Sequence, residues 1–409
     1  MGKHTMKRFD SLLSYRDAIS SFSSEKWKLP GTVKIPIDGA LGKISSDNVL
    51  SVKNIPCYDK SAMDGYAVLS KDTINASSSN PARLILKGYT AAGDPPGNII
   101  SSGECMEVYT GSIMPNGADA VARAENCETI GKYVYVYSPV SHGKNVSYTG
   151  EDIKKGDIIV NKNTIIYPQN IAAMKATRIQ SVNVYKKISI GIINTGKELV
   201  NGQIENSTGI LLRTFYETGY TETIDGGIVD DDMPSIIAQV KSIIEKCHIV
   251  IITGGSSLGR RDMTTEALSS QGKIIFSGVS IKPGRTIALF NIKNRPVLSV
   301  SGLPVAALIS SMVFVNQYIN NIYGIGYIHK TVSIMDESIH NRVGVTTFQI
   351  AETSGKNGEL HSVPVKTTVS GMISAMIRGN SIIKIDEDME GLPQGSTATI
   401  YIMGDIKWD

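Results

Sequence analysis

The residues best suited to chemistry are gathered in the second half of the chain, on short segments rich in glycine. Residues 253–259 read Thr-Gly-Gly-Ser-Ser-Leu-Gly, and a Gly-Gly-Ser turn lets backbone N–H groups approach an oxyanion closely. Asp262 follows this turn and residues 230–232 are all aspartate, so carboxylates that can hold Mg²⁺ accompany it. Lys282 and Arg285 add two cations around a Pro-Gly turn. These residue types predict a site for a phosphorylated ligand with a divalent metal.

Three turns in the first half also combine glycine with acidic or hydroxyl side chains. Asp64 precedes a glycine, and an acid on such an irregular segment can hold Mg²⁺ or polarise a phosphate site. Thr110 lies at the end of a strand-like run, where a hydroxyl and free backbone N–H groups suit an anion. Glu151 and Asp152 are paired acids that can bind a cation. Taken singly, each of the three is more often an ordinary solvated turn.

The elements that must position the second-half residues read as alternating strands and helices over residues 185–327. Three apolar runs alternate with two stretches of helical spacing, which indicates a mostly parallel sheet with helices on both faces. In such a sheet ligands bind at the carboxyl ends of the strands, where the turns at 194–199 and 253–259 are placed. The runs are 188–193, 249–252 and 297–300, and the helical stretches are 236–244 and 306–315.

Short strand-like runs between glycine, proline and serine turns occupy the two flanking regions. Residues 52–141 read as a small β-rich domain, and residues 328–409 as a small barrel or sandwich. Helical spacing is also found at 7–26 and at 170–176. At 409 residues, the length favours about two to four domains. The predicted strands are 83–87, 104–109, 133–137, 331–335, 346–351, 381–385 and 398–403.

Composition excludes several classes of function. The net charge is 41 − 38 = +3 without a long basic block, so nucleic acid is not an expected partner. No stretch reaches the roughly 18–20 apolar residues of a membrane helix, and the N-terminus has no apolar signal core. The 4 cysteines are scattered without a C-x-x-C pair, which argues against a zinc knuckle and favours a reducing cytoplasm. No zincin histidine pattern, Walker P-loop or G-x-S-x-G elbow is present, and His248 is expected to be structural.

Six segments, taken together and in order, resemble the MoeA family of molybdopterin molybdenumtransferases, which includes the E domain of gephyrin. The resemblance spans nearly the whole chain, and ordered motifs at compatible spacing are far more specific than any one of them. The segments are SAMDGYA (61–67), TGSIMPNGADAV (110–121) with Glu125, GKNVSYTGEDIKKGD (143–157), TGKEL (195–199), TGGSSLGRRDMT (253–264) and IKPGR (281–285).

The resemblance implies a multidomain α/β plus β fold, an elongated chain of four subdomains. These are a discontinuous N-terminal domain, an inserted β-rich domain, a central MogA-like α/β domain that binds molybdopterin, and a C-terminal β barrel. Family members are homodimers, with the site between the α/β domain of one subunit and the second and fourth subdomains of the other. The expected boundaries are 1–51 with 142–184, 52–141, 185–327 and 328–409.

The resemblance also implies that molybdate, or tungstate, is inserted into adenylylated molybdopterin with release of AMP and with Mg²⁺ assisting. It further implies a transient contact with the adenylyltransferase that makes this substrate. Matched position by position, the catalytic residues are Asp64, Thr110, Glu198, Asp231 and Asp262, and the metal ligands are Asp231 and Asp262. The substrate-binding residues are Asp152, Thr195, Gly254, Gly255, Ser256, Lys282, Arg285, Gly302, Pro304 and Ser370. Lys282 and Arg285 suit molybdate or a pyrophosphate.

Departures from the family pattern keep other functions open. The family segment Leu-Pro-Gly-Asn-Pro-Val-Ser-Ala reads Val-Ser-Gly-Leu-Pro-Val-Ala-Ala over 300–307, which removes two polar side chains. The family's Asp-Ser-Asn reads Asn-Ser-Thr at 206–208, and no clear basic residue lies near Gln349. One alternative is therefore a non-catalytic paralogue that binds adenylylated molybdopterin or acts as a scaffold. A molybdopterin adenylyltransferase is another, although the extra terminal domains argue against it, and a purely structural α/β protein is a third.

Overall fold

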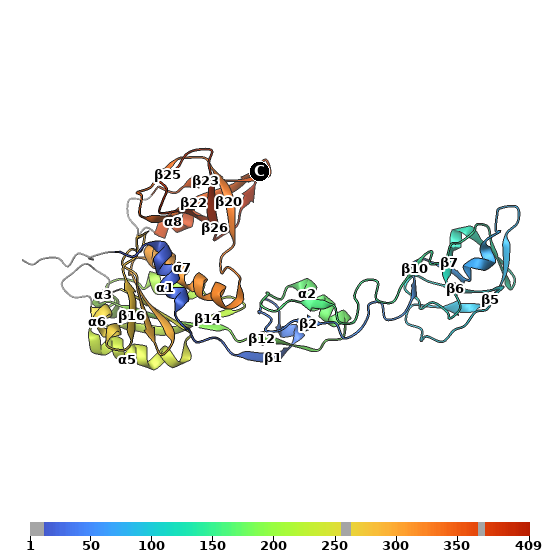
Figure 1. Ribbon diagram of the computed structural model, residues 1–409, viewed down its shortest axis with the longest axis horizontal. Coiled ribbons are helices and arrows are strands. Elements are labelled where there is room, and N and C mark those ends of the chain that lie inside the picture. The colour runs from blue at the N-terminus through green and yellow to red at the C-terminus, as the bar shows by residue number, and fades with distance from the viewer. Residues whose placement is uncertain (1–11, 255–262, 367–372) are drawn as a thin grey trace, which may run out of the picture.

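The computed structural model describes residues 12–254, 263–366 and 373–409, which form an elongated molecule (Figure 1). One end holds an α/β domain beside a C-terminal barrel, and the opposite end holds a β-rich domain. A slender middle portion that contains α2 (Pro168–Ala176) lies between them. Residues far apart along the long axis of the molecule therefore belong to separate domains.

The α/β domain is built on a six-stranded sheet, with four parallel strands followed by two strands that are each antiparallel to the strand before. The three predicted apolar strands are confirmed as β13, β15 and β19, and they are direct neighbours. The remaining three strands of the sheet were not predicted and are found in the structure. In order across the sheet, the strands are β14 (Thr221–Val229), β13 (Ile188–Thr195), β15 (Ile249–Thr253), β19 (Arg295–Val300), β18 (Ala288–Ile292) and β16 (Lys273–Ser277).

Helices cover both faces of this sheet, as predicted. Successive residues of a strand point to opposite faces, so Ile192 joins one hydrophobic core and Ile193 the other. The core around Ile192 includes residues of α1, α4 and α7, and the core around Ile193 includes residues of α5 and α6. The helices are α1 (Tyr15–Ser24), α3 (Lys197–Val200), α4 (Ser207–Phe215), α5 (Met233–Ile243), α6 (Met263–Ser269) and α7 (Pro304–Tyr323).

Two helices differ in extent from their predicted ranges. α7 continues well beyond the predicted 306–315 and ends where Gly324 takes a left-handed φ of 71°. Residues 7–11 of the predicted 7–26 lie outside the described residues, and in the described part α1 begins after Ser14, whose side chain accepts a hydrogen bond from Asp17 N. In both helices a capping residue sets the position of the end, and the spacing of apolar residues does not predict that position.

The C-terminal domain is a closed barrel of five strands, which decides between the predicted barrel and sandwich. The long strand β22 pairs with both β23 and β24 and so closes the ring. The short strand β17 (Ile281–Lys282), from the α/β segment, also pairs with β22. The barrel strands are β20 (Lys330–Met335), β22 (Thr346–Lys356), β23 (Glu359–Pro364), β24 (Ser381–Ile385) and β26 (Thr397–Ile402), accompanied by β21 (Ile339–His340), β25 (Gly391–Leu392), β27 (Lys407–Trp408) and α8 (Ile373–Arg378).

The β-rich domain contains a six-stranded sheet, and the three strands predicted in it are confirmed as β5, β6 and β9. The chain enters and leaves this domain through the paired strands β3 (Lys60–Ser61) and β10 (Val146–Ser147). In the middle portion β1 (Thr32–Pro36) pairs with β12 (Ser181–Tyr185), and β2 (Val49–Leu50) with β11 (Ile158–Val160). The six strands in order are β7 (Ala120–Arg123), β4 (Gly65–Val68), β6 (Glu104–Val108), β5 (Ala82–Thr90), β9 (Tyr133–Val136) and β8 (Cys127–Ile130).

Candidate functional site

The carboxyl ends of β13, β15 and β19 form one wall of the candidate site. Thr195 ends β13, and its buried Oγ1 donates to Thr253 O at 3.2 Å. Gly254 follows β15 with a φ of 97°, and a Cβ there would lie 2.3 Å from Thr195 O. A Cβ on Gly302, after β19, would lie 3.6 Å from Gly254 Cα. Glycine is therefore required at 254, and the wall is made largely of backbone, which can offer N–H groups to an anion.

Two segments that depart from the family pattern meet at this wall. Asn206 caps α4 by accepting a hydrogen bond from Gly209 N at 2.9 Å. Thr208, in the first turn of α4, donates its hydroxyl hydrogen to Gly302 O at 2.7 Å. Leu303 occupies the N-cap position of α7, just before Pro304, and its side chain is 48% exposed. A leucine cannot accept the hydrogen bonds that a polar N-cap accepts, so the first N–H groups of α7 lack that partner.

Acidic side chains lie beside this wall. Glu198 is in the first turn of α3, and its Oε1 lies 2.5 Å from the position of a Cβ on Gly196, at the end of β13. Asp231 follows β14, where partial burial and the neighbouring carboxylate of Asp230 raise its pKa. Asp232 instead caps α5 by accepting from Ser235 N at 2.9 Å. Asp230 Oδ1 also accepts a hydrogen bond, from Asp231 N at 2.8 Å, so the acidic run combines two adjacent carboxylates after β14 with a third that caps a helix.

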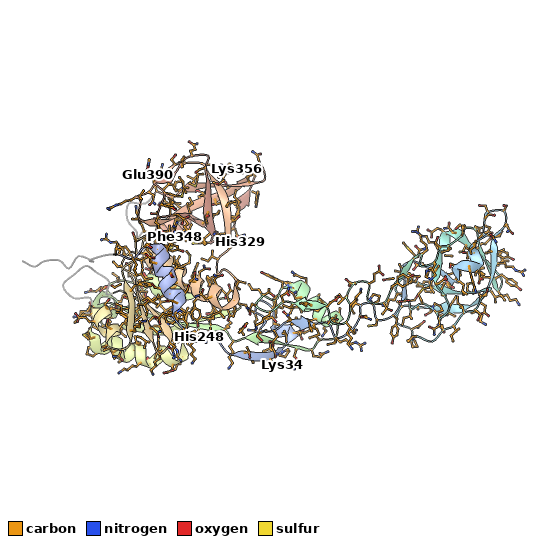
Figure 2. All side chains as sticks on the ribbon, in the orientation of Figure 1. Lys34, His248, His329, Phe348, Lys356 and Glu390 are labelled. Carbon is orange, nitrogen blue, oxygen red and sulfur yellow. The ribbon has the colours of Figure 1, made fainter. Side chains whose placement is uncertain are left out.

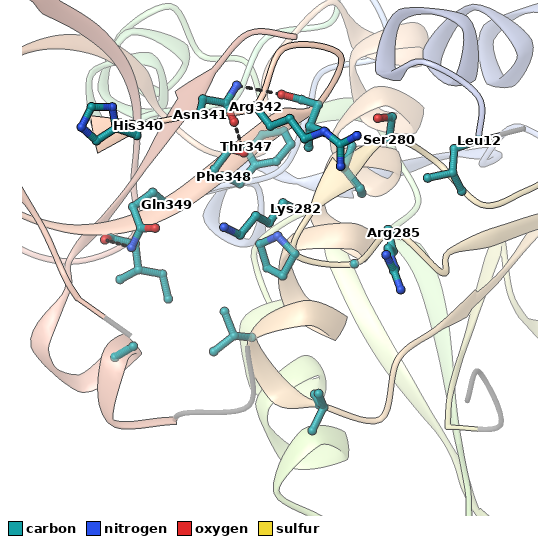
Figure 3. Close-up of a pocket in the computed structure, with 18 residues that line it drawn as sticks. Leu12, Ser280, Lys282, Arg285, His340, Asn341, Arg342, Thr347, Phe348 and Gln349 are labelled. Carbon is teal, nitrogen blue, oxygen red and sulfur yellow. Dashed lines mark hydrogen bonds between the residues drawn. The ribbon is translucent and has the colours of Figure 1, made fainter. Parts of the chain in front are cut away.

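Lys282 and Arg285 line a cavity of about 810 Å³ between the α/β segment and the barrel (Figure 3). Lys282 belongs to β17, which pairs with the barrel strand β22 and is not part of the six-stranded sheet whose strand ends lie beside the acids. Leu303 and Val305, which follow β19, also line the cavity. The cations thus face a space that extends from the strand-end wall toward the barrel.

At the opposite end of the molecule, Asp64 and Thr110 form a hydrogen-bonded pair. Asp64 Oδ1 accepts from Thr110 N at 2.7 Å and from Thr110 Oγ1 at 2.8 Å. Both hydrogen bonds favour the ionised carboxylate, and they lower the pKa of Asp64. The next residue, Gly65, has a φ of 157°, and a Cβ there would lie 2.0 Å from Ala122 O. The chain can follow this path only with glycine beside the acid.

Asp152 lies where the middle portion meets the β-rich domain. Its backbone N donates to Ile55 O at 3.1 Å, while its side chain is exposed. The neighbouring Glu151 accepts from Ser147 Oγ at 2.8 Å and from Tyr148 N at 2.9 Å, so that carboxylate organises the turn. The predicted pair of acids therefore divides into one that holds the loop and one that is free to meet a ligand.

Apart from Asp152, the predicted site residues that the structure describes fall into two groups within one chain. Thr195, Glu198, Asp231 and the cavity lysine and arginine belong to the α/β and barrel end, whereas Asp64 and Thr110 lie at the opposite end (Figure 1). Figure 2 gives the side chains in the same view and shows the length of the middle portion between them. Four of the predicted site residues lie outside the described ranges: Gly255, Ser256, Asp262 and Ser370.

Comparison with known proteins links all these segments to one family. The MoeA N-terminal region (domain I and II) matches residues 13–177, a "probable molybdopterin binding domain" matches 191–321, and the MoeA C-terminal region (domain IV) matches 333–403. A protein of Methanocaldococcus jannaschii named for molybdopterin biosynthesis is 31% identical over 404 residues, 95% of each chain. The chain belongs to the MoeA family.

Other MoeA-family proteins are similar over comparable lengths. A molybdopterin molybdenumtransferase of Staphylococcus aureus (strain COL) is 26% identical over 397 residues, 95% of this chain and 94% of its own. The crystal structure of a molybdopterin biosynthesis MoeA protein from Pyrococcus horikoshii covers 97% of this chain and 100% of its own, with 27% identity and a TM-score of 0.85. The predicted fold class is confirmed by this likeness.

The MoeA resemblance did not single out every residue that the structure places at the cavity. His340, at the end of β21, and Asn341 and Arg342, which follow it, also line the cavity. They belong to none of the glycine-rich motifs, so only the arrangement of the barrel reveals them. Within the described ranges, no helix has the length and apolar character to span a membrane.

Proposed function

We propose that this chain is a molybdopterin molybdenumtransferase of molybdenum cofactor biosynthesis. In this reaction it inserts molybdate or tungstate into adenylylated molybdopterin and releases AMP. The observation that carries the proposal is the cavity lined by Lys282 and Arg285, which reaches the loop after β19 in a chain that belongs to the MoeA family along its length. A large concave space with a few charged groups suits a phosphorylated pterin.

The chain's own residues have distinct parts in this proposal. Gly254 and Gly302 let the substrate's phosphate approach backbone N–H groups at the strand-end wall. Lys282 and Arg285 attract the oxyanion and neutralise its charge in the cavity. Asp64, kept ionised by Thr110, contributes a carboxylate from the opposite wall of the assembled site. The substrate is therefore held between groups of both signs.

Mg²⁺ is the proposed assisting cation. Asp230 and Asp231 offer the carboxylate oxygens that Mg²⁺ prefers, and a cation between them would relieve the repulsion that contributes to the raised pKa of Asp231. Asp262, the second predicted ligand, lies outside the described residues, and the described residues contain no cluster of three metal-binding side chains. The ion, when bound, supplies neutralisation of phosphate charge and polarisation of the phosphoanhydride.

We further propose that the active form is a homodimer. Asp64 precedes β4 of the β-rich domain and Thr195 ends β13 of the α/β domain. These two domains lie at opposite ends of the elongated chain, so one substrate cannot contact both residues within a single subunit (Figure 1). A two-fold pairing can place the β-rich domain of one subunit against the α/β domain of the other.

The four free cysteines are consistent with a reducing cytoplasm. In that compartment the adenylyltransferase could deliver its product directly.

The function is tested by measuring AMP release from adenylylated molybdopterin with Mg²⁺, adding molybdate and tungstate separately. Release that depends on the oxyanion supports the transferase, and the more effective oxyanion identifies its metal. Tight pterin binding without release would favour the scaffold paralogue instead. The observation behind this second candidate is Leu303, an apolar residue at the N-cap of α7 on the cavity wall. A Leu303→Asn variant that gains release would assign the defect to this position.

The dimeric site is tested by mixing two inactive variants, Asp64→Asn and Lys282→Gln, after subunit exchange. A heterodimer keeps one intact site, so activity should return to at most about one quarter of the wild-type value. Each variant alone serves as the control. Mixtures that stay inactive, although exchange is verified by a mass-labelled subunit, would exclude a site shared between subunits.

A further inference from the structure

The helix α1 contacts both domains that border the cavity, and its C-terminal end is fixed to the α/β domain (Figure 1). The rings of Phe22 and of Phe314 of α7 are buried, with centroids 5.7 Å apart. Glu25, which follows α1, accepts from Lys273 Nζ and from Asn291 Nδ2, both at 2.7 Å. Lys273 belongs to β16 and Asn291 to β18. The helix is therefore anchored to the six-stranded sheet.

The N-terminal end of α1 is held by the barrel. Glu387, in the loop after β24, accepts from the backbone N of Tyr15, the first residue of the helix, at 3.1 Å. Its other carboxylate oxygen lies 3.6 Å from Arg16 Nε, and Arg16 Nη2 donates to Asp388 Oδ2 at 3.0 Å. The Glu387 side chain is only 16% exposed. A helix N-terminus has free N–H groups and a partial positive charge, so a carboxylate from another domain is a favourable partner there.

The Tyr15 side chain adds to the same contact. Its ring meets Phe348 of β22 edge to face, with centroids 5.9 Å apart. On the barrel side, Lys384 Nζ lies 4.8 Å from the centroid of the Tyr15 ring, an arrangement in which the ring attracts the cation. Phe348 also lines the cavity. The end of α1 is thus attached to a strand that forms part of the cavity wall.

The residues just before α1 reach the other wall of the cavity. Leu13 forms a parallel bridge with Val279, and its N donates to Gly278 O at 3.2 Å. Ser280 N donates to Leu13 O at 2.7 Å, and β17 begins at the next residue. Leu12 and Ser280 both line the cavity (Figure 3). Residues 12–16 therefore contact both walls at once.

The charged contact differs in kind from the apolar one between the same two domains. Phe348 and Ile382 of the barrel share a hydrophobic core with Met312 of α7. Apolar burial stabilises the pairing of the domains but has no direction. The hydrogen bond and the ion pair of Glu387 depend on distance and angle, so they select one orientation of the barrel.

We propose that Glu387 is a positioning residue, which holds the barrel at one orientation to the α/β domain and so sets the width of the substrate cavity. Glu387 does not line the cavity, and it acts through α1 and β22. That the cavity takes the substrate rests on the proposed function. Without the contact, the barrel takes further orientations, and the apparent Kd rises as the fraction of binding-competent protein falls. Saturating substrate restores that orientation, so kcat changes little.

The first measurement is titration of the full-length protein with adenylylated molybdopterin. Glu387→Ala should raise the apparent Kd about tenfold. Glu387→Gln should raise it only about threefold, because the amide oxygen still accepts from Tyr15 N. Arg16→Gln should also weaken binding, and by less in the Glu387→Ala background than in the wild type, since both changes remove one contact.

The matched control is Glu390→Gln. Glu390 is exposed on the same loop, and no described side chain forms a hydrogen bond or an ion pair with its carboxylate. The control therefore removes one negative charge from the loop without touching α1, and its apparent Kd should equal the wild-type value.

Hydrogen exchange of the ligand-free proteins is the second measurement. The amides of 280–285 and 342–348 lie on the two walls, and in Glu387→Ala they should exchange about threefold faster or more than in the wild type and the control. This readout needs no substrate, so it reports on the contact itself.

A graded rise in Kd with kcat retained and faster exchange at both walls supports the proposal. Unchanged Kd in Glu387→Ala would overturn it, and so would an equal rise in Glu390→Gln or fully additive effects of Arg16→Gln and Glu387→Ala. Unchanged exchange at both walls would also overturn it, because the barrel would then keep its position without Glu387. Wild-type protein that does not bind the pterin overturns it as well. Binding without oxyanion-dependent AMP release would contradict only the proposed function.

Discussion

The two ends of this chain form their parts of the site in opposite ways. In the β-rich domain, Asp64 lies on an exposed loop and is held by hydrogen bonds from a single partner, Thr110. At the α/β end, Thr195 is buried and Gly254 fits against it with no space for a side chain. The first part depends on one functional group, whereas the second depends on close packing of backbone. Chemistry and stability should therefore be separable at the first end and inseparable at the second.

Replacing Asp64 should produce the largest loss of activity with the smallest loss of stability. Asp64→Asn removes the negative charge, and we expect oxyanion-dependent AMP release to fall on the order of 10²-fold or more. The melting temperature should stay within about one degree, because the carboxylate is exposed and surface changes cost little.

A matched control for Asp64 exists in the same domain. Asp72 accepts from Ser102 Oγ at 2.7 Å and from Gly103 N at 2.7 Å, the same pair of donor types that Asp64 has. Asp72→Asn should therefore leave AMP release near the wild-type rate. Equal losses in both variants would mean that Asp64 acts through the loop structure and has no chemical part.

At the α/β end, Gly254→Ala should damage stability and activity together. A Cβ would lie 2.3 Å from Thr195 O, and the φ of 97° disfavours any side chain. We expect a loss of about 2–3 kcal/mol in the free energy of unfolding, measured in urea, with substrate binding weakened in parallel.

The control for Gly254 is Gly202, after α3, which has a φ of 64° and nothing within 4 Å of its Cβ position. Gly202→Ala bears the conformational cost without the clash, so it should lose only about 1 kcal/mol. If both variants lose the same stability, the close approach of Gly254 to Thr195 is not the cause.

A smaller effect is expected where residues 206–208 meet the loop after β19, the two segments that depart from the family pattern. Thr208→Val removes the hydrogen bond to Gly302 O and should cost about 1 kcal/mol of unfolding free energy. It should also raise the apparent KM, because the loop after β19 loses a support. Thr214→Val on the same helix removes only an exposed hydroxyl bonded within α4, so no change in KM is expected. An unaltered KM in Thr208→Val would exclude this loop from substrate binding.

The smallest predicted effect is on the free energy of unfolding at acidic pH, and it comes from His248, which contacts the amino end of β13. His248 Nδ1 accepts from Ser189 N at 3.0 Å, and burial lowers the pKa of His248. Protonation is then easier in the unfolded chain, so the contribution is present above about pH 6.5 and is lost as pH falls. His248→Asn keeps an acceptor that does not titrate and should flatten stability between about pH 7 and 5. A wild-type slope in this variant would assign the acid sensitivity to other groups.

Long apolar runs allowed part of the fold to be predicted. β13, β15 and β19 are buried along their length and were recognisable, whereas β14 and β16 are only partly buried and carry fewer apolar residues. β18 is mostly buried, and its apolar run over 287–290 is as long as that of β15, so composition does not explain why it was missed. The site motifs were recognisable because glycine is needed where backbone packs closely, as at Gly65 and Gly254. Asp232 was grouped with its neighbours although it caps α5, since a cap and a ligand look alike in sequence.

By itself, the sequence determined the secondary elements with strong periodicity, the glycine turns at strand ends and the resemblance to a family. These features depend on which residue types stand at neighbouring positions, so they can be predicted from local backbone preferences and apolar spacing alone. Only the tertiary structure decided that Lys282 joins the barrel, that Thr208 meets Gly302 and that Arg342 enters the cavity. It also decided that the β-rich domain, which bears Asp64, lies at the opposite end of the molecule from the α/β domain, which bears Thr195. Such contacts join residues far apart in the chain, and their positions follow from how whole domains pack and pair their strands.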